Sequence, residues 1–113
     1  MAFVRFVLPA GAHDIRLVSR AAVPQELGIA RDARALGVAV QGITVWKGRH
    51  VRAFSAEDTI FTDGFHPFEP DTNARWTDGQ ASLPPAILQG FDGPVELIIT
   101  RTGGTHYVED AAA

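Results

Sequence analysis

The chain has 113 residues, of which 46% are apolar and 20% charged, so it is long enough to fold as one domain with a core, and its composition excludes a disordered chain. The net charge is −3 and the basic residues are scattered, which argues against a nucleic-acid-binding protein. The chain contains no cysteine, which excludes disulfides, thiolate metal sites and thiol catalysis.

The first half of the chain contains segments with the two-residue alternation of β-strands, separated by turn residues. Residues 3–8 form a nearly continuous apolar run, and residues 15–20 place Ile15 and Leu17 on one face and two arginines, residues 16 and 20, on the other. Residues 37–46 predict a longer strand, in which the apolar face changes phase at Gln41-Gly42. This change of phase predicts a β-bulge.

In the second half, residues 51–54 are a short candidate strand and residues 95–99 show a clear alternation. Two glycines, residues 103–104, follow the second of these. They suit a tight hairpin turn, which would place Ile99 opposite Val108.

Residues 64–83 carry two aromatic segments on either side of a polar turn, which predicts a hairpin. A five-residue loop would place Glu69 opposite Arg75. A four-residue loop would place Glu69 opposite Ala74 instead. A slip of one residue exchanges the two faces, and the sequence does not choose between these registers.

These elements predict an all-β fold, namely a single antiparallel β-sandwich over residues 1–113, jelly-roll-like, with seven or eight strands. Helix is scarce. Residues 24–36 read as a long loop with at most one helical turn.

No cofactor, metal site or catalytic residue is predicted. The four histidines lack the spacing of metal ligands, and the serines lack a nucleophile-elbow motif. The N-terminus lacks the features of a signal peptide, and no apolar run reaches the ~18 residues of a membrane span. We expect no membrane partner and, by default, a cytoplasmic location, with an exported or envelope-associated one left open.

The strongest ligand-binding hypothesis is a carbohydrate surface, on which aromatic rings cover a sugar and charged groups bind its hydroxyls. The candidate contacts are Trp46, His66, Phe68, Glu69, Arg75 and Trp76. The competing structural interpretation places Trp76 and Phe65 in the core and makes Glu69–Arg75 a cross-strand ion pair. Trp46 can likewise be interpreted either as a sugar contact or as a core residue.

Four segments and two single residues carry a family resemblance: residues 15–20, 32–40, 64–66 and 75–79, together with Pro24 and Glu69. They resemble an accessory domain that follows Hint (hedgehog/intein-type) domains in some bacterial proteins, and related sandwiches stand beside glycosyltransferases of surface-polysaccharide pathways. The similarity spans residues 3–108. It implies a β-sandwich in a setting of glycan or envelope proteins, with no catalytic residues to transfer.

The sequence therefore predicts a non-catalytic accessory module that binds carbohydrate. The alternative is an assembly module, in which an exposed edge strand or aromatic patch pairs two chains into a homo-oligomer. A third class, a small cupin-like enzyme, would require a metal ion.

Overall fold

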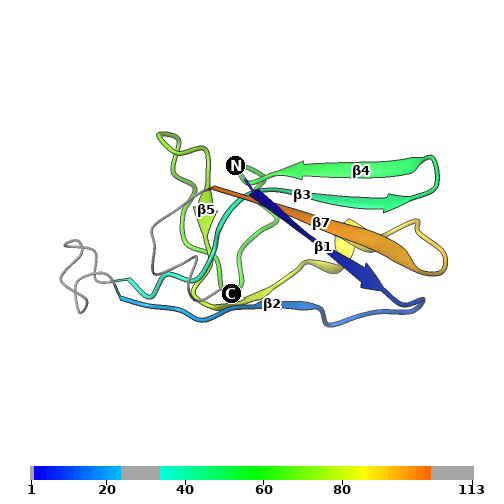
Figure 1. The fold of residues 1–113 in the computed structure, drawn as a ribbon, viewed down its shortest axis with the longest axis horizontal. Helices are drawn as coiled ribbons and strands as arrows, with labels where there is room; N and C mark the ends of the chain where they lie inside the picture. Colours follow the sequence, from blue (N-terminus) through cyan, green and yellow to red (C-terminus); the bar gives the residue numbers. More distant parts are fainter. Residues whose placement is uncertain (1, 24–33, 103–113) are drawn as a thin grey trace.

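The computed structural model describes residues 2–23 and 34–102, which form two antiparallel β-sheets packed as layers (Figure 1). The elements are β1 (Ala2–Leu8), β2 (Arg16–Val18), β3 (Ala39–Lys47), β4 (His50–Ser55), β5 (Arg75–Trp76), β6 (Gln80–Ser82), the 3₁₀ helix η1 (Pro85–Leu88) and β7 (Val95–Arg101). The predicted all-β antiparallel sandwich is confirmed, with seven strands in the described part of the chain.

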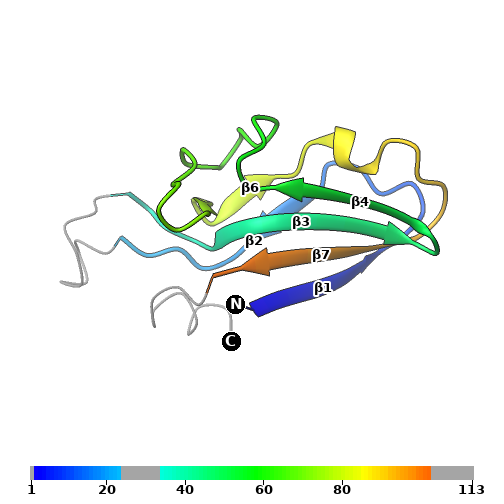
Figure 2. The ribbon, with the colours of Figure 1, turned by 90° about the horizontal axis from the view of Figure 1, so that it is seen from above.

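The larger sheet has the order β1-β7-β3-β4, and β5 also pairs with β3 (Figure 2). β7 therefore lies between β1 and β3, with Ile99 opposite Val4 on one side and Ile43 on the other. Ile99 thus has a described partner on each side, and Val108, its predicted hairpin partner, lies outside the described residues. Residues 103–113, which include the predicted second strand of that hairpin, lie outside the described residues.

The predicted β-bulge in β3 is confirmed. The pairing of β3 with β7 shifts register between Val40 and Gly42. On the other side of β3, Val40 pairs with Arg75 of β5, whereas Gly42 pairs with Ser55 of β4. The bulge thus lies where β3 changes partners.

The core lies between the large sheet and the second layer, the two-stranded β2–β6 sheet. The alternating residues of β3 and β7 point into it, and Ile87 of η1 is also fully buried. Apart from η1, no helix occurs in residues 2–23 and 34–102, and η1 is too short to cross a membrane. The predicted loop at residues 24–36 falls mostly outside the described residues, although Leu36 at its end pairs with Ala22.

A buried hydrogen-bond cluster around Thr77 joins the two halves of the chain. Thr77 is 0% exposed, and its Oγ1 accepts a 3.0 Å hydrogen bond from the Val38 N–H. The Thr77 carbonyl accepts another, of 2.8 Å, from the Gly37 N–H. A Cβ atom at Gly37 would lie 2.5 Å from Thr77 Oγ1, so glycine is required there by close packing.

Candidate functional site

The predicted carbohydrate contacts separate into two groups at opposite ends of β3. Trp76 pairs with Ala39, the first residue of β3, whereas Trp46 lies one residue before its end. The seven residue steps from Ala39 to Trp46 span about 23 Å in an extended strand. Trp46 therefore does not share a surface with the other predicted contacts.

The Arg75 side chain donates hydrogen bonds to three loop carbonyl groups. Its Nε donates to the Ala56 carbonyl oxygen at 2.8 Å, and its two terminal nitrogens donate to the carbonyls of His66 at 3.2 Å and Asp58 at 3.4 Å. The His66 ring is itself engaged, with Nε2 2.8 Å from the Ala35 carbonyl oxygen. Both side chains thus organise the loops around β5.

Glu69 forms an ion pair with Arg34, with 2.8 Å between Oε2 and the guanidinium nitrogen. The backbone of Glu69 pairs with Ala74, which corresponds to the four-residue loop. The predicted Glu69–Arg75 ion pair is therefore wrong. The two residues are not opposite each other, and Arg75 is directed to carbonyl oxygens.

The remaining predicted contacts of this group are partly buried. Trp76 and Phe65 pack against the core cluster, as the structural interpretation predicted, and Phe68 is half-buried. Contacts within the fold thus engage five side chains of this region: Phe65, His66, Glu69, Arg75 and Trp76.

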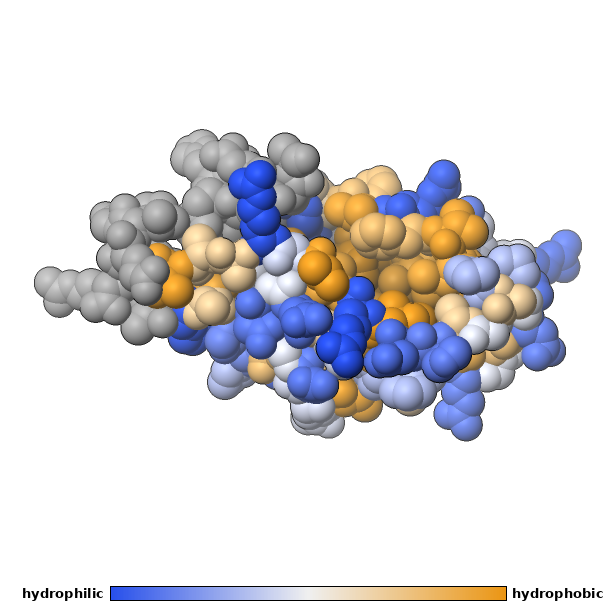
Figure 3. Space-filling view, turned by 90° about the horizontal axis from the view of Figure 1, so that it is seen from below, coloured by the Kyte–Doolittle hydropathy of each residue, from blue (hydrophilic) through white to orange (hydrophobic). Residues whose placement is uncertain are grey.

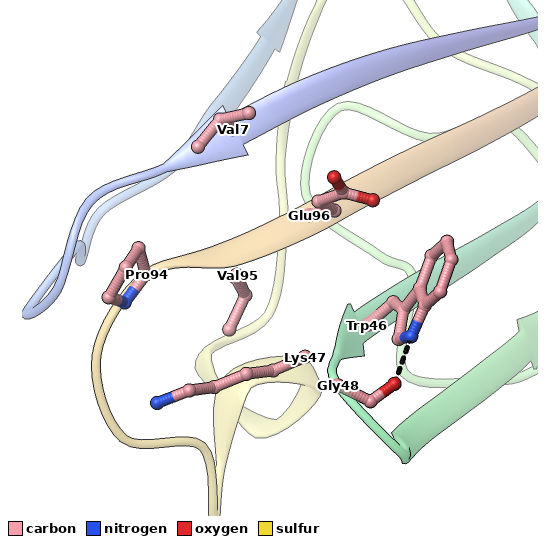
Figure 4. A pocket seen from close by; sticks show the side chains of 7 residues that line it. All are labelled: Val7, Trp46, Lys47, Gly48, Pro94, Val95 and Glu96. Carbon is pink, nitrogen blue, oxygen red and sulfur yellow. Dashed lines mark hydrogen bonds between the residues drawn. The ribbon is translucent and has the colours of Figure 1, made fainter.

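Trp46 lies instead on the outer face of the large sheet, beside a shallow depression of about 310 Å³ that we call the Trp46 hollow (Figure 4). Its lining residues are Val7, Trp46, Lys47, Gly48, Pro94, Val95 and Glu96. The indole is 40% exposed, and its N–H donates to the Gly48 carbonyl. In the same cross-strand row, Glu96 lies between Trp46 and Val7. An exposed ring thus stands beside a carboxylate.

A second surface, which sequence reasoning did not locate, is the outward edge of β1, which we call the β1 edge. The exposed fractions are 70% for Phe3 and 69% for Val7 on the outer face, and 37% for Val4 and 42% for Phe6 on the core face. β1 pairs with β7 on one side only, and no strand among the described residues pairs with its other side.

The core face of β1 is exposed because the second layer, with only two strands, leaves it partly uncovered. Between β1 and β2 lies a hollow of about 180 Å³ with mostly apolar walls. Figure 3 shows apolar side chains gathered in a hollowed area on this side of the molecule. Ser19 and Arg101 also line this hollow, and each has a buried polar atom, Oγ and Nε respectively, without a hydrogen-bond partner among the described residues.

The opposite edge of the large sheet, β4, is protected. Arg52 pairs with the buried Val45, so it projects from the core face of the edge strand. Its guanidinium lies 5.2 Å from the centre of the Phe91 ring and donates to the Gln89 carbonyl. His50 stacks on the same Phe91 ring at 4.0 Å. Cationic and covered edges of this kind oppose further strand pairing.

No group of three or more metal-ligating side chains that could hold an ion occurs within the part of the chain that the structure describes. In comparisons with known proteins, no family model, curated protein or solved structure matches this chain. The candidate surfaces therefore rest on their own geometry.

Proposed function

We propose that this domain is a non-catalytic assembly module that binds an extended polypeptide strand at the β1 edge. The supporting observation is that Phe3, Val4, Phe6 and Val7 are all more than a third exposed along one seven-residue strand. An outward strand edge offers a row of N–H and C=O groups, and an added strand supplies their partners. The alternating apolar side chains would then provide contacts on both faces.

The contrast between the two edges of the sheet favours this proposal. β4 carries the inward-projecting Arg52, whereas the core-face residues of β1 are apolar throughout: Val4, Phe6 and Leu8. The single charge of β1, Arg5, lies on the outer face, 3.8 Å from Glu96. Within residues 2–23 and 34–102, β1 therefore lacks the charged and covered positions that discourage strand addition.

A labelled peptide with the sequence of residues 2–8 tests the proposal. We expect saturable binding to the domain, measured by fluorescence anisotropy. The control is the same peptide with alternate backbone nitrogens methylated, which removes donors while the side chains stay unchanged. Equal binding of the two peptides, or no binding of either, would overturn the strand-pairing proposal.

The Trp46 hollow favours carbohydrate binding as a second candidate function. An exposed indole can cover the apolar face of a sugar ring, and the neighbouring Glu96 carboxylate can accept hydrogen bonds from its hydroxyls. This proposal retains Trp46 from the predicted contacts and adds Glu96, which the sequence did not single out.

Titration with neutral and acidic polysaccharides tests it, with quenching of tryptophan fluorescence as the measurement. The Trp46→Phe variant should lose most of the response, and the Trp76→Phe variant should keep it. An unchanged response in Trp46→Phe, or none in the wild-type protein, would contradict carbohydrate binding at this hollow.

A further inference from the structure

We infer that the strand bound at the β1 edge is β1 of a second copy of this chain, antiparallel and centred on Arg5. This inference rests on the proposed strand-pairing function and names its partner. The resulting dimer would have one continuous large sheet, with the two β1 strands adjacent at its centre.

The apolar pattern of β1 is self-complementary about Arg5. In a pairing centred there, Phe3 lies opposite Val7 of the second copy, and Val4 lies opposite Phe6 of the second copy. Two-fold symmetry repeats both pairs. Each pair joins an aromatic to a β-branched side chain, a favourable cross-strand combination. One pair lies on the outer face and the other on the core face.

A slip of the second strand by one residue would bring core-face residues opposite outer-face residues. The next registers that keep the faces aligned therefore slip by two residues, which moves the centre of the pairing by one residue, to Val4 or Phe6. Centring on Phe6 would bring Pro9, which has no N–H donor, opposite Phe3. Centring on Val4 would place Phe3 opposite Arg5 and leave Val7 without an opposing residue of β1. The register centred on Arg5 uses every residue of β1, from Ala2 to Leu8.

The cost of this register is that the two Arg5 side chains approach each other at the symmetry axis. Each Arg5 lies 3.8 Å from Glu96 of its own chain, and its side chain is 60% exposed. The carboxylates offset part of the repulsion, and water screens the remainder. Replacing Arg5 by a neutral residue should therefore strengthen the association.

The symmetry also limits the assembly to two copies. A two-fold pairing uses the same edge of both chains, so it closes on itself. The remaining edge of the large sheet consists of β4, which Arg52 and Phe91 protect, and of the two-residue β5, which is flanked by the bridges Phe65–Thr77 and Glu69–Ala74. With the axis perpendicular to the sheet, both second layers lie on the same side. Val4 and Phe6 of each copy then cover one another beside the hollow between β1 and β2.

The cysteine-free chain allows a direct test of the register. Opposed residues of antiparallel strands have Cα atoms about 4.5–5.5 Å apart, within the range that a disulfide spans. Arg5→Cys should therefore form a disulfide-linked dimer under mild oxidation. Phe3→Cys alone should not, because the two residues 3 would lie about 13 Å apart along the strands. Mixing Phe3→Cys with Val7→Cys should restore the cross-link.

Val51→Cys is the matched control, since Val51 is exposed on the outer face of the protected strand β4. We expect Arg5→Cys to cross-link at least about 10-fold faster than Val51→Cys. Equal rates would overturn the inference. Cross-linking by Phe3→Cys alone but not by Arg5→Cys would overturn the register.

Sedimentation of the wild-type protein from about 1 µM to about 1 mM tests association itself, a range that includes weak interfaces. We expect a shift to twice the mass of the chain. A monomer at every concentration, together with binding of the β1 peptide, would overturn the second copy as partner and leave strand pairing intact. A monomer that also fails to bind the peptide would overturn both proposals.

Discussion

The Nε of Arg75 lies 2.8 Å from the carbonyl oxygen of Ala56, so a strand residue of β5 ties down the loop that follows β4. The same guanidinium reaches the carbonyls of His66 and Asp58. A planar group with five N–H donors is well suited to several fixed carbonyls at once. Arg75 was a predicted carbohydrate contact, but its donors are occupied by carbonyl groups of the same domain.

We predict that Arg75→Ala lowers the free energy of unfolding by about 2–3 kcal/mol, because half-buried carbonyls lose a charged donor. Urea denaturation measures the effect. Arg20→Ala, at an exposed position, is the control and should change the free energy by less than about 0.5 kcal/mol. Equal effects of the two substitutions would show that the Arg75 contacts do not stabilise the fold.

Thr77→Val tests the buried hydroxyl separately from packing. The substitution keeps the shape but removes the acceptor of the Val38 N–H, so we expect a loss of about 2 kcal/mol. Thr77→Ser keeps the acceptor and removes one methyl group, which should cost about 1 kcal/mol. Thermal or urea unfolding compares the two variants. A greater loss in Thr77→Ser would mean that packing and not the hydrogen bond dominates at this position.

The local features of the fold could be predicted from the sequence because they follow from neighbouring residues. The alternation of Val95, Leu97 and Ile99 corresponds to buried positions of β7, and the change of phase at Gln41-Gly42 corresponds to the bulge. Both depend on a period of two along one segment. This alternation within a segment does not indicate which strands pair with one another in the sheet.

For that reason, the sequence did not distinguish β1 from β7. Both are apolar runs, but among the described strands β7 has a neighbour on each side whereas β1 has one. The sequence allowed the hypothesis that an edge strand pairs two chains, but it did not indicate which strand lies at the edge. Similarly, the sequence did not show that Trp76 packs against the core while Trp46 is exposed, because burial depends on which elements pack together.

A charge introduced on the outer face of β1 should weaken dimerisation, whereas the same charge on β4 should not. Val7→Lys places a cation where a second copy would bring Phe3, so we expect at least about 10-fold weaker dimerisation, corresponding to ~1.4 kcal/mol. Val51→Lys makes the same change at a comparably exposed outer-face position of β4. Sedimentation equilibrium compares the two variants. Equal effects would indicate a general charge effect and would contradict pairing at β1.

Removing each tryptophan should have unequal effects on stability. Trp76 packs against the core, so Trp76→Ala should lower the free energy of unfolding by about 3 kcal/mol. Trp46 is 40% exposed on the outer face, and Trp46→Ala should cost about 1 kcal/mol or less. Urea unfolding followed by far-ultraviolet circular dichroism avoids dependence on tryptophan emission.

A small stability loss in Trp46→Ala would leave a folded protein in which sugar binding at the Trp46 hollow can be measured directly. A loss as large as that of Trp76→Ala would instead assign Trp46 a structural role. Its exposed ring would then be explained by support of the β3–β4 turn through the hydrogen bond to the Gly48 carbonyl, and Trp46 would not be available as the aromatic contact for a sugar at this hollow.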